Sequence, residues 1–322
     1  MKQSRNAAVA AILFSILAPA AHGQTYPVKP VRMVVPFPPG GGVDLTGRLL
    51  QQGLSAGLGQ PVIIENRAGA SGVIGAEYVA RAVPDGYTIG YTAGSDLAMR
   101  PFVSKEFKLD VLRDFTPIAP ALESVGCIAV SASMPVKSLS ELFDYARKNP
   151  GKLNYGSAGI NASHHLIGES LKQFGIDMVH VPFNGLAPAV LALVGGQIEV
   201  NITNVVSVAA QVRDGKVKIL GLTRAKRFAD MPDIPTLTEV VPAYSFPVSF
   251  FAFFGPADLP QAIVGRINAE VGRAVGSPEL RAKARDLGMV DIYTTPEQFN
   301  AMLRGAVAEF GAAVKSGRIQ PQ

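Results

Sequence analysis

The feature that most constrains the fold is an alternation of short apolar runs with longer amphipathic segments. Runs such as 31–36 and 87–92 have the length and composition of buried strands. Amphipathic segments such as 45–58 follow them after short loops, with apolar residues at helical spacing. A strand followed by a helix, repeated, is typical of parallel βαβ units. We therefore predict an α/β fold in which open, mostly parallel sheets are flanked by helices.

The predicted elements fall into two sets, which indicates two lobes. The chain crosses from the first set to the second near Leu122 and crosses back near Phe250. We assign residues 27–122 and 251–322 to lobe 1 and residues 123–250 to lobe 2, joined by a hinge of two crossings. About 300 residues follow the N-terminal segment, enough for two domains that each bury a core. Because ligands of open α/β sheets bind at the carboxyl ends of strands, we expect the site in the cleft between the lobes.

The first 23 residues have the composition of a cleavable signal peptide. Lys2 and Arg5 form a basic start, an apolar run follows, and small residues precede two possible cleavage positions, near Ala20 and Gly23. The apolar run is shorter than the ~20 residues of a membrane-spanning helix, although an uncleaved anchor is the alternative. We expect export to the periplasm, with residues 1–23 removed.

The charge balance excludes a nucleic-acid-binding protein. The chain has 30 Lys and Arg against 25 Asp and Glu, and the basic residues are scattered rather than clustered. The single cysteine, Cys127, lies in an apolar run and cannot form an intramolecular disulfide. We expect it to be buried and inert.

The most unusual segment is the loop 36–44, Pro-Phe-Pro-Pro-Gly-Gly-Gly-Val-Asp, between a predicted strand and a predicted helix. Its glycines let the backbone approach a ligand, and the free amides of the helix start suit an anion, with Asp44 as the N-cap. The third glycine of a dinucleotide fingerprint and the lysine of a phosphate loop are missing, so we expect no cofactor. A stiff turn without a ligand is the alternative. The candidate ligand residues here are Phe37, Pro39, Gly40, Gly41, Val43 and Asp44.

A second loop of the same design occurs at 156–163 in lobe 2. A strand ends, small residues expose amides, and a helix begins near Ser163. Two such helix starts facing each other would hold two carboxylates, each contact contributing ~0.3–1 kcal/mol or more when partly buried. The candidate ligand residues here are Ser157, Ala158, Gly159, Ser163 and His165. Further candidates, which are also common turn residues, follow other predicted strands: Gly94, Ser95, Asn184, Gly185 and Thr203.

Ser157 and the histidines near it also raise the question of catalysis or metal binding. A nucleophile elbow needs glycine two residues before the serine, where Tyr155 stands. His164, His165 and His180 lack the cysteine or acidic residue that would complete a metal-binding spacing. We predict neither an enzyme nor a metal site, and a periplasmic serine hydrolase is the remote alternative.

Segments along nearly the whole chain after residue 25 resemble one known family in order and spacing. They are 26–32, 35–44, 59–62, 65–70, 84–88, 150–155, 180–183, 225–227 and 232–236. These segments are similar to the receptors of tripartite tricarboxylate transporters, the Bug family. The resemblance implies a two-lobed, type II-like periplasmic binding protein fold that closes on a small organic acid. It also implies permease subunits in the membrane as partners, and we expect the receptor to be a monomer.

The family's typical ligands are di- and tricarboxylates, acidic amino acids and aromatic acids, held largely by main-chain amides and bridging waters of the two glycine-rich loops. Val43 stands where members often have Thr or Ser, and Phe183-Asn184 where they commonly have Tyr-Lys or Tyr-Arg. Thr203 stands where members with a Phe-Asp-Asn run have Asp, a carboxylate that an amine would need. These departures favour a di- or tricarboxylate or an aromatic acid without an amine. A sensor that signals to a membrane kinase through the same clamp is the alternative function.

Overall fold

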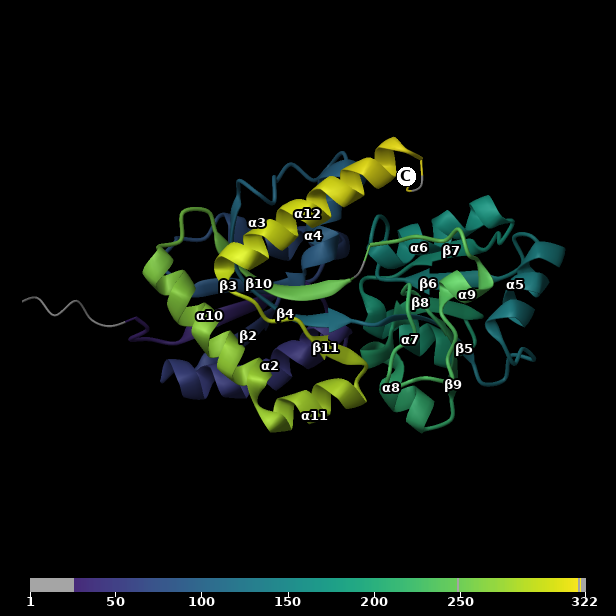
Figure 1. Ribbon diagram of the computed structural model, residues 1–322, viewed down its shortest axis with the longest axis horizontal. Coiled ribbons are helices and arrows are strands. Elements are labelled where there is room, and N and C mark those ends of the chain that lie inside the picture. The colour runs from purple at the N-terminus through teal and green to yellow at the C-terminus, as the bar shows by residue number, and fades with distance from the viewer. Residues whose placement is uncertain (1–25, 248, 318, 320–322) are drawn as a thin grey trace, which may run out of the picture.

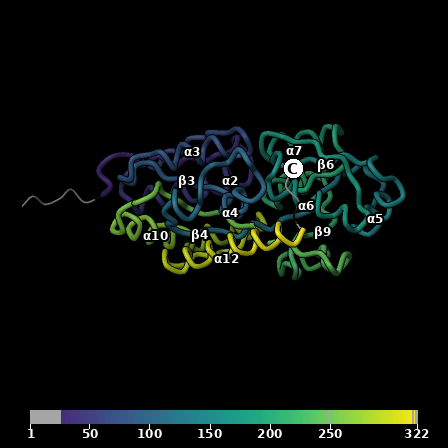
Figure 2. Tube along the Cα trace, turned by 90° about the horizontal axis from the view of Figure 1, so that it is seen from above, coloured from purple at the N-terminus to yellow at the C-terminus, as the bar shows by residue number. Residues whose placement is uncertain are grey.

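The computed structural model describes residues 26–247, 249–317 and 319, which form two α/β lobes that lie end to end along the long axis (Figures 1 and 2). The predicted signal peptide, with both cleavage positions, lies outside the described residues. In the part of the chain that the structure describes, no helix is long and apolar enough to span a membrane. The predicted fold class, with its two lobes, is confirmed.

The sheet of lobe 1 has six strands. In spatial order they are β11 (Met289–Asp291), β4 (Phe115–Ser124), β10 (Phe250–Pro256), β3 (Thr88–Ala93), β1 (Val31–Val35) and β2 (Val62–Asn66). β1 pairs in parallel with β2 and β3, whereas β10 runs antiparallel to its neighbours β3 and β4. The parallel part of this sheet therefore directs its strand ends, and the loops that follow them, toward lobe 2.

Helices cover both faces of this sheet and enclose two apolar cores. On one face lie α2 (Gly42–Leu58), α10 (Gln261–Gly276) and α11 (Pro278–Asp286). On the other lie α3 (Val73–Ala80), which follows a 3-10 turn at Ala70–Gly72, α4 (Gly94–Val103) and α12 (Pro296–Lys315). The helices at the end of the chain thus pack on lobe 1, as Figure 1 shows.

The sheet of lobe 2 has five strands. In spatial order they are β7 (Val179–Pro182), β6 (Asn154–Ser157), β8 (Val200–Asn204), β5 (Gly126–Ser131) and β9 (Val217–Leu222). One face packs against α5 (Leu139–Lys148), α6 (Ser163–Leu171) and α9 (Leu237–Val240), and a 3-10 turn, Lys172–Phe174, follows α6. The other face packs against α7 (Leu186–Val194) and α8 (Val205–Arg213). Cys127 of β5 is buried.

The two crossings between the lobes are short and lie side by side. Only Val125 separates β4 from β5, and the returning chain enters β10 at Phe250. The amide of Ser124 donates a 2.9 Å hydrogen bond to the carbonyl of Ser249, so the crossings are tied together. A pair of short crossings joined in this way suits a hinge, because rotation there disturbs few contacts of either core.

The sequence reading missed β4, whose Pro117 and Pro120 argue against a strand inside a sheet. Proline cannot donate a ladder hydrogen bond and is normally confined to sheet edges and bulges. β4 nevertheless lies between β10 and β11. Its register with β10 shifts twice, and Pro120 and Pro117 pair with Ala252 and Phe254 directly after these shifts. The irregular ladder accommodates the missing donors.

Candidate functional site

A small cavity lies between the lobes, where strand ends of both sheets meet. Lobe 1 and the returning crossing contribute Phe37, Gly41, Gly42, Val43, Ala93, Asp96, Ser249 and Phe251, and lobe 2 contributes Ala158, His164, Leu186 and Asn204. Its volume is about 20 Å³, room for one water molecule or two. The lobes are therefore closed on each other, and a larger ligand requires them to move apart.

Five helices begin at this cavity. Its lining contains an N-cap or first-turn residue of each: Gly42 of α2, Ala93 before α4, His164 of α6, Leu186 of α7 and Asn204 before α8. In none of the five does the N-cap side chain accept a hydrogen bond from the helix. First-turn amides and the positive ends of five helix dipoles are thus directed at one small volume.

Several helices away from the cavity begin differently. Ser138, Ser277 and Thr295 accept hydrogen bonds at the starts of α5, α11 and α12, and Thr236 forms a capping box at α9. α3 and α10 begin elsewhere without such a cap. A side-chain cap satisfies first-turn amides and adds roughly 1 kcal/mol of stability. Because the five cavity helices lack one, their first-turn amides need other partners, and an anion is a partner that such helix starts bind well.

Two hydrogen bonds between the lobes show how these amides are used in the closed form. The amide of Gly42, in lobe 1, donates to Ser207 Oγ of lobe 2 at 3.1 Å. The amide of Ser163, in lobe 2, donates to Asp96 Oδ1 of lobe 1 at 3.3 Å. Each lobe therefore presents a side-chain oxygen to a helix start of the other.

The polar side chains of the cavity are Asp96, His164, Asn204 and Ser249; among the described residues, no lysine or arginine lines it. His164 Nε2 lies 3.1 Å from Asn204 Oδ1, and its buried Nδ1 has no partner among the described residues. Burial lowers the pKa of His164, and the Asp96 carboxylate and the Asn204 hydrogen bond oppose this only in part. The apolar walls come from Phe37, Val43, Leu186 and Phe251.

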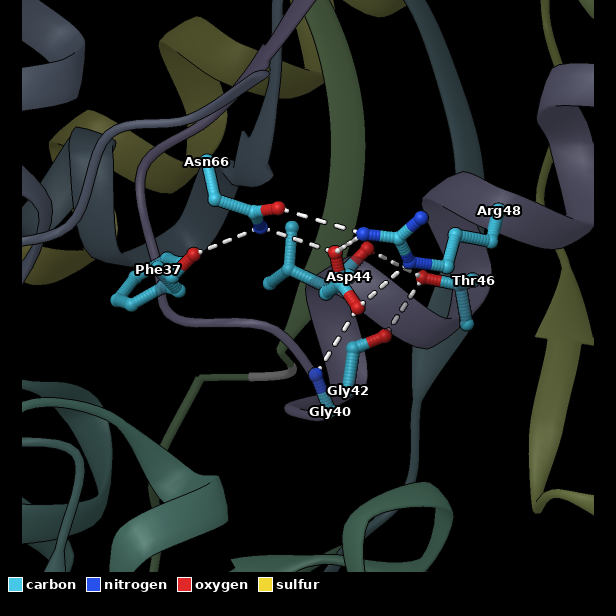
Figure 3. A network of polar contacts seen from close by, with 8 residues as sticks. Phe37, Gly40, Gly42, Asp44, Thr46, Arg48 and Asn66 are labelled. Atoms are coloured by element: carbon cyan, nitrogen blue, oxygen red, sulfur yellow. Dashed lines mark hydrogen bonds and ion pairs between the residues drawn. The ribbon is translucent and has the colours of Figure 1, made fainter. Parts of the chain in front are cut away.

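The glycine loop that forms one wall is held by Asp44, outside the cavity (Figure 3). Asp44 Oδ2 accepts from the amide of Gly40 at 2.9 Å and from Arg48 Nε at 2.9 Å. Asp44 Oδ1 accepts from Arg48 Nη2 at 3.0 Å and from Asn66 Nδ2 at 2.9 Å. Asn66 Nδ2 also donates to the carbonyl of Phe37 at 3.0 Å. The buried carboxylate thus connects both ends of the loop to β2 and α2.

The electrostatics of Asp44 follow from these contacts. Burial alone would raise its pKa, but hydrogen bonds from Arg48, from Gly40 and from Asn66 outweigh burial and hold the pKa below its usual range. The prediction that Asp44 caps α2 is wrong: the helix begins at Gly42, and its N-cap is Gly41. The side chain reaches back to the amide of Gly40 instead.

In the second loop, Ser157 and His165 lie behind the cavity wall. Ser157 is fully buried, and its Oγ donates to the carbonyl of Gly159 at 3.2 Å and accepts from the Gly159 amide at 3.1 Å. His165 Nδ1 accepts from the amide of Asn161 at 3.1 Å, and its ring stacks on His180 at 3.9 Å. Both side chains thus form hydrogen bonds with backbone groups of their own loop.

Ser157 Oγ lies only 2.7 Å from His180 Nε2, which resembles a catalytic pair. The single hydroxyl hydrogen of Ser157 can go to His180 or to the carbonyl of Gly159, which lies 3.2 Å away. Ser157 is fully buried and does not line the cavity, so a substrate has no direct access to its hydroxyl in this form. The described residues contain no group of three or more side chains arranged for a metal ion.

The predicted ligand residues are distributed around the cavity. Those that line it are Phe37, Gly41, Val43 and Ala158. Ser163 contributes its amide to Asp96, and Ser95 Oγ lies 3.3 Å from Ser249 Oγ. Thr203 does not line the cavity: it is fully buried in β8, opposite Cys127, without a hydrogen-bond partner among the described residues.

The remaining predicted residues lie where the lobes touch or at the surface. A Cβ on Gly94 would lie 2.3 Å from the Phe250 ring, and one on Gly185 would lie 2.8 Å from Pro38 of the opposite lobe. Pro39, Gly40 and Asn184 are exposed. Gly159 and Asn184 line a separate open groove of about 670 Å³ between the lobes, which also contains Arg100.

The sequence analysis did not predict Asp96, His164 and Asn204, the polar residues that line the cavity together with Ser249. Each is the immediate neighbour of a predicted residue, because the residue that faces the cavity depends on where the strand ends and the helix begins. If the predicted start of the helix is wrong by one residue, the side chain expected in the cavity points away from it. The signal that could have located these residues is the absence of a capping Ser, Thr or Asp at the N-cap positions of these helices.

A larger open groove, of about 1030 Å³, lies on lobe 1 beside β1 and β2 but has a different character. Its charged side chains pair with one another: Arg32 lies 3.0 Å from Glu65, and Arg81 lies 2.9 Å from Glu77. Arg67 also pairs with Glu65. These charged side chains of the groove are therefore satisfied by one another.

Comparison with known proteins places this site in a family. The model of the tripartite tricarboxylate transporter family receptors matches residues 46–318. The chain belongs to this family. A UPF0065 protein of Bordetella pertussis is 33% identical over 98% of this chain and 97% of its own length. The resemblance inferred from the sequence is therefore confirmed, and the chain is a solute-binding receptor.

Solved structures agree over both lobes. A Rhodopseudomonas palustris protein solved with adipate is 31% identical and covers 92% of this receptor and 100% of its own chain, with a TM-score of 0.87. MatC of Rhodopseudomonas palustris, solved with bound malate, is 31% identical and covers 90% and 100%, with a TM-score of 0.83.

Proposed function

We propose that the receptor works in the periplasm, where it closes around a small organic carboxylate and delivers it to the membrane permease of a tripartite tricarboxylate transporter. The observation that carries the proposal is the meeting of five uncapped helix starts at one cavity. Such a cavity binds an anion through backbone amides, without a full positive charge. The receptor would act as a monomer and without a cofactor.

Closure follows from the hinge. Residues 27–122 with 251–322 would move as one body and residues 123–250 as the other, about the crossings at Val125 and before Phe250. A ligand shifts the balance only if it binds the closed form better, and a change from mostly open to mostly closed needs about 5 kcal/mol of differential affinity. Ligand carboxylates that replace Ser207 and Asp96 at two helix starts would contact both lobes at once.

The ligand we favour is a dicarboxylate or an aromatic acid without an amine. Adipate and malate, bound by the two related structures, are dicarboxylates. The aromatic and aliphatic walls at Phe37 and Phe251 suit a ligand with an apolar body. Neither adipate nor malate carries an amine. Succinate should therefore bind more tightly than aspartate.

A thermal-shift screen tests the proposal. The panel contains adipate, malate, succinate, citrate, benzoate and aspartate, each beside its uncharged amide where one exists. A ligand at a hundred times its dissociation constant stabilises the folded state by about 2.7 kcal/mol, a clear shift in melting temperature. Stabilisation by at least one carboxylate and not by its amide supports the proposal. No shift with any carboxylate contradicts it.

A further inference from the structure

The described part of the receptor contains three histidines, and one of them differs from the others in its partners. His165 and His180 stack on each other, and each has a hydrogen-bond partner in the 157–161 loop. His164 lines the cavity between the lobes and is 6% exposed. Its Nδ1 is buried without a partner among the described residues.

The tautomer of His164 is set by Asn204. Nε2 lies 3.1 Å from Asn204 Oδ1, which can only accept, so Nε2 carries a hydrogen. Nδ1 is therefore either a bare acceptor in the neutral ring or a donor in the imidazolium. Buried polar atoms in folded proteins nearly always have a partner. Because His164 lines the cavity between the lobes, its unpartnered Nδ1 indicates contact with the ligand itself.

The charges of the cavity decide between the two forms. Asp96 supplies a carboxylate, and a dicarboxylate ligand would bring two more negative charges. The five helix ends supply only partial positive charges. Of the side chains that line the cavity, His164 is the one that can take a full positive charge.

We propose that His164 donates a hydrogen bond from Nδ1–H to a ligand carboxylate as an imidazolium, and that the receptor takes up one proton from solvent as it closes on its ligand. The proton adds to Nδ1, and no bond of the ligand changes. The inference rests on the proposed function, because it requires an anionic ligand. It assigns a specificity-determining role to a residue that the glycine loops do not contain.

The surroundings of His164 are consistent with a single protonation. Asp96 faces it from α4, with Arg100 one turn further along. The pair Glu123 and Arg224, 3.0 Å apart, lines the neighbouring pocket at the crossing and is neutral overall. Glu169 of α6 pairs at 2.7 Å with Lys172 of the 3-10 turn that follows the helix.

The direction of the pH dependence follows from the burial of the ring. In the closed form without a ligand, burial lowers the pKa of His164, so the ring is neutral near neutral pH. A carboxylate beside Nδ1 raises the pKa in the complex. The affinity for the ligand is then highest below the pKa that His164 has in the free receptor. It falls as pH rises through the pKa that His164 has in the complex, by up to about tenfold per pH unit.

Isothermal titration calorimetry with adipate and with malate tests this inference. Titrations at pH 7.5 in Tris, Hepes and Bis-Tris, which differ in ionisation enthalpy, give the number of protons taken up per ligand. We expect between about half a proton and one proton for the wild type, since burial lowers the pKa of His164 in the free receptor and leaves the ring neutral at this pH. His164→Asn should abolish the uptake and flatten the pH dependence of binding, with its fold checked by circular dichroism.

The control is His180→Asn, which removes a neighbouring imidazole outside the cavity and should keep the proton uptake. Binding of adipate or malate by the wild type without proton uptake would overturn the inference while leaving the proposed function intact. Uptake that persists in His164→Asn would also overturn it. If the wild type binds neither these acids nor any other carboxylate of the panel, the proposed function fails, and this inference fails with it.

Discussion

The amide of Gly42, the first residue of α2 in lobe 1, donates a 3.1 Å hydrogen bond to Ser207 Oγ on α8 of lobe 2. A helix start that would bind an anion is thus occupied by a hydroxyl of the opposite lobe. The closed form stabilises itself through the same amide that we assign to the ligand. Competition between Ser207 and ligand oxygens then sets part of the affinity.

Gly42→Ala should weaken ligand binding by about tenfold or more. The added Cβ would lie 2.7 Å from Val206 Cγ1 of lobe 2, and overpacking of this kind costs ~1–3 kcal/mol. The steric conflict exists only when the lobes are closed, so the melting temperature of the open form should change little. Titration calorimetry measures the loss.

The matched control for that variant is Gly305→Ala, on the exposed side of α12 with no atom near the new Cβ. It should leave binding unchanged and stabilise the helix by ~0.5–1 kcal/mol. Equal affinity of Gly42→Ala and wild type would show that α2 does not approach α8 in the liganded receptor.

Ser207→Ala should strengthen binding by about 2- to 10-fold, because a hydrogen bond that the ligand must displace is worth ~0.5–1.5 kcal/mol. The variant removes only the hydroxyl that accepts from Gly42. The dissociation constant of the best carboxylate, compared with wild type, checks this. Weaker binding would instead place Ser207 among the groups that hold the ligand.

Asp44→Asn should destabilise the receptor by ~1–3 kcal/mol, since a buried group that accepts several hydrogen bonds loses its charge. Because the folded-state pKa of Asp44 is lowered, its contribution is present above the unfolded value near 3.9 and is lost as pH falls through the folded value. The urea unfolding free energies of wild type and variant should therefore differ at pH 7, and the difference should shrink as pH falls through the lowered folded-state pKa of Asp44. Asp144→Asn, at an exposed pair with Arg147, should cost less than ~1 kcal/mol. A difference in unfolding free energy between wild type and Asp44→Asn that stays the same at all pH values would contradict the stabilising role of the Asp44 carboxylate.

Ser157→Ala should lower stability without removing any hydrolytic activity. Its hydroxyl joins the Gly159 backbone to His180 and does not face the cavity. An ester panel monitored with wild type and variant should give the same rate as buffer. Turnover that disappears in the variant would establish the hydrolase instead.

The fold was largely predictable because its signals are local. β1 and β3 lie within one residue of the predicted runs 31–36 and 87–92, and α2 contains the predicted helical segment 45–58. β4 was missed because its prolines forbid a regular ladder, and only its partner β10 shows how the register shifts around them. Pairing between distant segments cannot be read from local composition.

The candidate site was predictable as two loops but not as a set of side chains. Asp44 is a residue type that often caps helices. Its carboxylate instead accepts hydrogen bonds from Arg48, Asn66 and the amide of Gly40. His164 lines the cavity because of the way α6 is rotated about its axis. If the helix began one residue later, His165 would face the cavity instead. The rotation of a helix about its axis is set by tertiary packing, which local sequence does not show.

The central claim is that backbone amides of uncapped helix starts in both lobes hold a carboxylate ligand. Its most direct test is a crystal structure of the receptor with the acid that gives the largest thermal shift. We expect carboxylate oxygens about 2.7–3.2 Å from amide nitrogens at the starts of α2 and α6, with the lobes closed and Ser207 displaced from Gly42. A ligand held chiefly by lysine or arginine side chains, or bound outside this cavity, would contradict the claim.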